Sequence, residues 1–145
     1  NNESAAESIL EDLKAVGIRA KPKWMMGKWD RLYQQFLNGG IPLVFMTWGS
    51  YSIFDAGALL NHFFMADSRA CYGTTPEINR LLEQANGTLA PEEREKLLSK
   101  AQKRISEEAF WVPICSVEVI CAMHKDLQFR PTMDEIDRYF LASWP

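Results

Sequence analysis

Few side chains in this chain could attack a substrate or move a proton. Its 145 residues include two histidines, His62 and His124, and three cysteines. A nucleophile needs a base within hydrogen-bonding reach, and the base needs an orienting group. Neither histidine nor Cys71 lies in a known catalytic motif. We therefore expect a binding protein with no catalytic residue, no cofactor and no metal site, and a thiol hydrolase built on Cys71 is an alternative.

The richest set of binding side chains lies between residues 48 and 55. Two aromatic rings, two hydroxyl groups and a glycine follow a continuous apolar run over 43–48, which predicts a buried strand. Ligands bind at such strand ends in open α/β sheets. A loop that Trp48 packs for stability is the other interpretation, and capping the next helix is the main role expected of Asp55. The predicted ligand-binding residues are Trp48, Gly49, Ser50, Tyr51, Ser52 and Asp55.

Hydrophobic periodicity predicts the elements that must position this segment. Apolar residues at three- and four-residue spacing predict helices, and continuous or alternating apolar runs predict strands. Helices are expected over 6–16, 29–37, 56–64, 76–85, 91–105 and 134–141, and strands over 18–23, 43–48 and 111–123. This alternation predicts an α/β fold, a helix-flanked mixed sheet, as a single domain over 1–145.

Composition narrows the class of protein. Hydrophobic residues make up 47% of the chain and charged residues 24%, with a net charge of −3, so we expect a globular protein and no nucleic-acid partner. No apolar stretch reaches the roughly 20 residues of a membrane span. Cys115 and Cys121 fall within the last predicted strand, where we expect two small buried side chains. The start, Asn1 to Ser4, lacks a methionine and a signal peptide, and we expect a piece of a longer protein.

Five segments, taken in order, resemble one protein family. They are SILEDLKAVGI (8–18), LVFMTWGSYSIFD (43–55), EINRLLEQA (77–85), PEEREKLLSKAQKRISEEAFWVP (91–113) and DEIDRYFLASW (134–144). Together they resemble the second, C-terminal lobe of the family 5 extracytoplasmic solute-binding proteins, the peptide- and nickel-type receptors of ABC importers. The resemblance implies one lobe of a type II periplasmic-binding-protein fold.

The same resemblance implies a function. The full-length protein would be periplasmic, would capture a peptide or a similar small polar solute outside the inner membrane, and would deliver it to ABC permease subunits. In peptide-binding members, an acid after the Trp-Gly pair often anchors the amino terminus of the ligand. Tyr51 stands near that position here. The resemblance therefore leaves open a peptide that is held differently, an opine, a sugar conjugate or a metal chelate.

The alternative to the receptor is a different full-length protein that contains a domain of the same fold. The same fold also serves as a cytoplasmic ligand-sensing effector domain attached to a transcription regulator. For the chain on its own we expect weak or no ligand affinity, because half of the cleft would be missing. We also expect self-association through exposed apolar surface.

Overall fold

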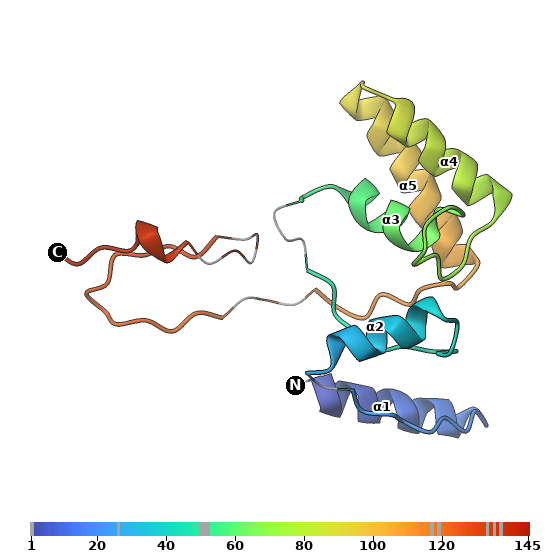
Figure 1. The fold of residues 1–145 in the computed structure, drawn as a ribbon, viewed down its shortest axis with the longest axis horizontal. Helices are drawn as coiled ribbons and strands as arrows, with labels where there is room; N and C mark the ends of the chain where they lie inside the picture. Colours follow the sequence, from blue (N-terminus) through green and yellow to red (C-terminus); the bar gives the residue numbers. More distant parts are fainter. Residues whose placement is uncertain are drawn as a thin grey trace. The chain divides into compact units, whose positions relative to one another are not determined.

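The computed structural model describes residues 2–25, 27–49, 53–116, 118, 120–132, 134, 136 and 138–145. Its helices are α1 (Asn2–Ala15), α2 (Trp29–Leu37), α3 (Ala56–Phe64), α4 (Pro76–Gly87), α5 (Pro91–Glu107) and the 3₁₀ helix η1 (Tyr139–Leu141), as Figure 1 shows. The chain divides into two compact units, Asn1–Thr47 and Trp48–Pro145. The expected single domain over 1–145 stays a prediction.

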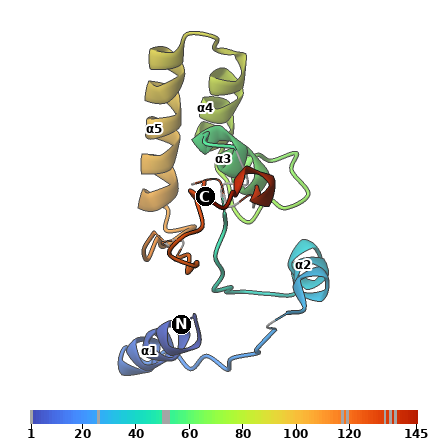
Figure 2. The same cartoon turned by 90° about the vertical axis from the view of Figure 1, so that its left-hand side faces the viewer.

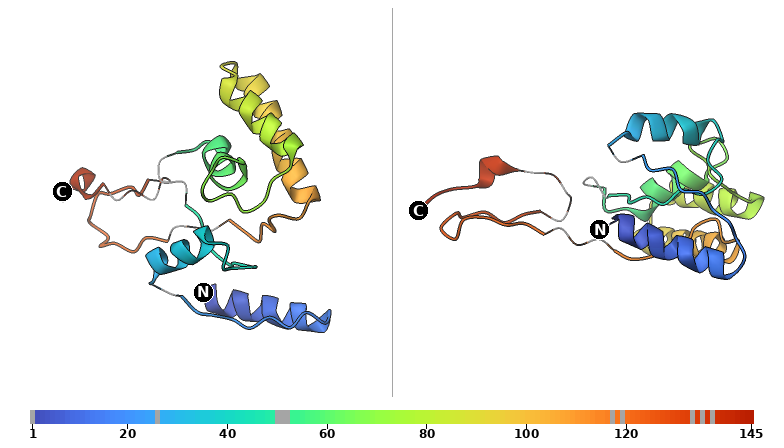
Figure 3. Two further views of the ribbon diagram at one scale, coloured as in Figure 1. Left: turned by 45° about the vertical axis from the view of Figure 1, so that its right-hand side comes forward. Right: turned by 90° about the horizontal axis from the view of Figure 1, so that it is seen from below.

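The predicted helix-flanked mixed sheet is wrong. In the described part of the chain the only β pairing is an isolated antiparallel bridge between Gln128 and Ser143. The three predicted strand segments are drawn as irregular coil wherever they are described (Figure 3). An apolar run shows only that a segment avoids water, whereas a strand exists only when another segment pairs with its backbone groups. The assignment to one lobe of a type II periplasmic-binding-protein fold is therefore corrected as well.

The first unit contains two helices that end in the same way. Gly17 follows α1 and has a φ of 87°. Its N–H donates to the carbonyl of Lys14 at 3.0 Å, and the N–H of Ile18 donates to the carbonyl of Leu13 at 2.8 Å. Gly39, with φ of 66°, closes α2 in the same pattern. These are Schellman caps, which satisfy the last carbonyls of a helix and favour glycine in the left-handed region. The helix stops predicted at the two glycines are confirmed.

In the second unit, three helices surround one apolar core. α4 and α5 lie side by side, and α3 packs against both (Figure 2). The side chain of Thr75 accepts the N–H of Ile78 at 3.2 Å and Pro76 occupies the first turn of α4, so the predicted helix start is confirmed. The buried apolar residues of this core are Leu60, Phe63, Phe64, Ala70, Ile78, Leu81, Leu82, Ala85, Leu98, Ala101 and Ile105. Burying each large side chain contributes roughly 1.5–3 kcal/mol.

Arg104 joins the beginning of α4 to the end of α5. Its Nε lies 3.0 Å from Glu77 Oε2, and its Nη2 lies 2.7 Å from Glu108 Oε1. The pKa of the Arg104 guanidinium is raised, and the hydrogen bond to Glu107 is the largest cause. This network holds the two helix ends together in the α4–α5 hairpin.

The C-terminal segment differs from its prediction. Within 134–141, the described residues form one short 3₁₀ turn, η1, in place of the expected helix. Arg138 makes two parallel hydrogen bonds to Asp134, at 2.8 and 2.7 Å. Cys115 and Cys121 are free and exposed, so the prediction that both are buried is wrong. The described residues of 111–123 form no strand that would bury them.

Candidate functional site

The structure describes both ends of the predicted ligand-binding segment, residues 48–55. Trp48 and Gly49 start the second unit, and Asp55 directly precedes α3. Ser50, Tyr51 and Ser52, the other predicted ligand-binding residues, lie outside the described residues. The geometry of the two ends can therefore be described, and the contribution of the middle stays a prediction.

Trp48 rests on an aromatic cluster held by α3. Its ring stacks on His62 with centroids 5.2 Å apart, and it meets the ring of Phe63 edge-on at 4.8 Å. Phe63 also contacts Trp111, which follows α5, at 5.0 Å. Aromatic pairs of this geometry contribute about 0.5–1.5 kcal/mol beyond their buried area. These contacts fix the Trp48 ring in place. The residue is still 38% exposed, so its ring is also partly accessible to solvent.

Asp55 fixes the other end of the segment. Its Oδ1 accepts the N–H of Gly57 at 2.6 Å, so the predicted helix cap is confirmed. Arg94, on α5, donates to both carboxylate oxygens, with Nη2 2.9 Å from Oδ1 and Nη1 bonded to Oδ2. The hydrogen bonds from Arg94 hold the pKa of Asp55 below its usual value, against the opposing effect of partial burial. The same contact raises the pKa of Arg94.

Gly57 allows this close approach. A Cβ atom at position 57 would lie 2.5 Å from Arg94 Nη2 and 2.7 Å from Asp55 Oδ1. Glycine therefore leaves room for the guanidinium beside the first turn of α3, and a larger residue would require Arg94 or Asp55 to shift. Sequence reasoning missed both Arg94 and Gly57. Arg94 lies 39 residues from its partner in a charged stretch typical of a solvated helix face, so no local signal singled it out.

A hollow of about 480 Å³, partly open to solvent, lies beside this ion pair. Asp55 and Arg94 form part of its border, and we name it the α3–α5 hollow. Its other lining side chains include Phe54, Leu89, Glu95, Leu98, Ser99 and Gln102.

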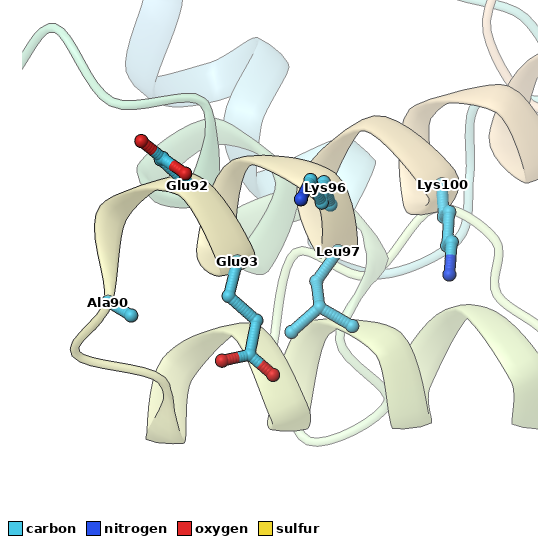
Figure 4. Close-up of a pocket in the computed structure, with 6 residues that line it drawn as sticks. All are labelled: Ala90, Glu92, Glu93, Lys96, Leu97 and Lys100. Atoms are coloured by element: carbon cyan, nitrogen blue, oxygen red, sulfur yellow. The ribbon is translucent and has the colours of Figure 1, made fainter.

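A second hollow, of about 540 Å³, lies on another part of α5. Figure 4 shows Glu93, Leu97 and Lys100 extending toward the same side of the helix, while Glu92 extends to the opposite side. Positive and negative side chains are mixed around this second hollow. It offers a control for the first, because both are built on one helix.

The geometry gives little support to thiol catalysis. Cys71 is half-buried, and burial raises the pKa of its thiol, which lowers the fraction of reactive thiolate at neutral pH. His62 stacks on Trp48. Among the residues that the structure describes, no group of three His, Cys, Asp or Glu side chains is placed to bind a metal ion. None of the helices in the described ranges is long and apolar enough to cross a membrane.

Comparison with known proteins gives one distant relative. Over 132 residues, or 88% of its length, the chain is 24% identical to the probable di/tripeptide-binding protein 5 of Pseudomonas aeruginosa (strain UCBPP-PA14). The chain spans about a quarter, 25%, of the length of that protein. No family model matches the chain. No solved structure matches it either. The relative is named as a binding protein and not as an enzyme.

Proposed function

We propose that this chain is part of a solute-binding protein that captures di- or tripeptides outside the inner membrane and delivers them to the permease subunits of an ABC importer. The observation that carries the proposal is the similarity to a probable di/tripeptide-binding protein over 88% of the chain. The order of the resembling segments, from 8–18 to 134–144, supports the same assignment.

The proposed ligand site is the segment from Trp48 to Asp55, including Gly49, Ser50, Tyr51 and Ser52. Two features support it. The Trp48 ring is partly exposed and is held by His62 and Phe63, so it could receive an apolar part of a ligand with little loss of side-chain entropy. The cap and ion pair of Asp55 hold the opposite end of the segment against α3.

Asp55 has a positioning role in this proposal. Both of its carboxylate oxygens accept hydrogen bonds from Arg94, and Oδ1 also accepts the N–H of Gly57. The amino terminus of a peptide would have to compete with a guanidinium for the same oxygens. We therefore propose that Asp55 fixes the segment beside the ligand and that the amino terminus is held by another group.

Isothermal titration calorimetry on the complete gene product tests the function. The ligands are the dipeptide Ala-Phe and the tripeptide Ala-Ala-Phe, with free alanine and phenylalanine as controls. We expect both peptides to bind and the free amino acids to bind at least about tenfold more weakly, a difference of about 1.4 kcal/mol. If the complete protein binds neither peptide, the proposal is wrong.

The variant W48A tests the site separately from the function. The matched control is W144A, because Trp144 also contacts a histidine, His124, with ring centroids 5.5 Å apart and ring planes tilted by 56°. We expect W48A to weaken Ala-Phe binding about tenfold and W144A to change it less than twofold. Equal effects of the two variants would remove Trp48 from the site and leave the peptide-binding function intact.

A further inference from the structure

The α3–α5 hollow has a net negative charge. Asp55, Arg94 and Glu95 are the charged side chains of its lining. Arg94 and Asp55 neutralise each other through two parallel hydrogen bonds. Glu95 forms no ion pair within the described ranges of the chain, so it contributes a carboxylate that is not compensated locally.

The remaining lining is largely apolar with two neutral polar groups. Phe54 is 66% exposed and Leu89 is 97% exposed, and both flank the hollow beside the buried Leu98. Ser99 and Gln102 add a hydroxyl and an amide. Apolar surface of this kind favours a guest that can cover it. At about 480 Å³, the hollow lies within the range of ordinary ligand sites, roughly 300–1,000 Å³.

We infer that the α3–α5 hollow receives a basic side chain, lysine or arginine, of the bound peptide. Its aliphatic stem would lie against Phe54, Leu89 and Leu98, and its cation would meet Glu95. Lysine and arginine are suited to such a place, because they bury a methylene stem while the charged head stays near water. The inference rests on the proposed function, since the hollow borders the end of the proposed ligand segment at Asp55.

The charges also argue against an acidic guest. A carboxylate in the hollow would be repelled by Glu95, and the positive charge of Arg94 is already balanced by Asp55. The hollow therefore selects for positive charge, and Glu95 is its specificity-determining residue.

Calorimetry with two dipeptides that differ by one ammonium group tests the inference on the complete gene product. Ala-Lys carries the cation, and alanyl-norleucine has the same stem without a charge. We expect Ala-Lys to bind about threefold more tightly, since an exposed ion pair contributes a modest amount. The variant E95Q should weaken Ala-Lys binding to the level of alanyl-norleucine, and should leave alanyl-norleucine within twofold of the wild-type value.

The matched control is E93Q, which removes the same charge two residues earlier on α5, in the second hollow (Figure 4). We expect E93Q to keep the threefold preference for Ala-Lys. Equal binding of the two dipeptides by the wild type, or a preference that E95Q leaves unchanged, would overturn the inference and leave the proposed function standing. If neither dipeptide binds, the inference fails, and the titration with Ala-Phe decides whether the proposed function fails with it.

Discussion

Arg94 and Asp55 join the first turns of two helices through a two-pronged ion pair. Asp55 caps α3, and Arg94 lies in the first turn of α5, so the contact locks the starting points of both helices. Parallel hydrogen bonds between guanidinium and carboxylate fix orientation as well as distance. The pair therefore determines where the segment that ends at Asp55 meets the helical core.

Two substitutions at Asp55 separate the cap from the ion pair. Asparagine caps helices as well as aspartate does, so D55N keeps the cap and removes the charge that faces Arg94. We expect D55N to lower the free energy of unfolding by about 0.5–1 kcal/mol, a small value because the side chain is 39% exposed. D55A removes both interactions and should cost about 1–2 kcal/mol. Urea unfolding followed by circular dichroism measures both values, and equal losses would contradict a separate cap contribution.

The ion pair predicts a pH dependence of stability. Folding lowers the pKa of Asp55 below its ordinary value of 3.8, chiefly through the hydrogen bonds from Arg94. The contribution of the pair is therefore complete above the ordinary value and is lost as the pH falls through the lower, folded-state pKa. We expect the stability difference between wild type and D55N to be constant from pH 7 to about pH 5 and to shrink toward pH 2. Urea midpoints across this range test it, and a difference that grows in acid would reverse the predicted sign.

A side chain at position 57 is predicted to disturb the ion pair between Arg94 and Asp55. G57A would place a methyl group against Arg94 Nη2 and Asp55 Oδ1, so one of the two partners must move. We expect a loss of at most about 1 kcal/mol in the free energy of unfolding, because the atoms that must move are side-chain ends and alanine itself favours the helix. G87A is the control, because nothing lies within 4 Å of a Cβ built on Gly87, and alanine favours a helix over glycine. In thermal unfolding, the melting temperature of G87A should equal or exceed that of the wild type, and the melting temperature of G57A should be lower.

Cys71 should react slowly with a thiol reagent. Burial raises the pKa of its thiol, and the side chain is only partly accessible. In the variant C115S/C121S, which leaves Cys71 as the single cysteine, we expect reaction with Ellman's reagent at pH 8 to be about tenfold slower than that of a free thiol in solution. Reaction faster than that of free cysteine would indicate an activated thiol and revive the hydrolase alternative. C71S supplies the rates of Cys115 and Cys121 for comparison.

The sequence by itself determined the helices α1 to α5 and several of their ends, but it wrongly predicted a helix over 134–141. Gly17, Gly39, Thr75 with Pro76, and the cap at Asp55 act within one turn of the chain, so their effects can be predicted from neighbouring residues. Other features were decided by the tertiary structure alone. In the described residues, the apolar runs at 43–48 and 111–123 form no sheet. Trp48 stacks on His62, and Arg94 meets Asp55, which lies 39 residues away in the sequence. Helix signals are local because the backbone hydrogen bonds span four residues. Strand pairing, ring stacking and cross-helix ion pairs join distant segments, and their partners are set only when the chain packs.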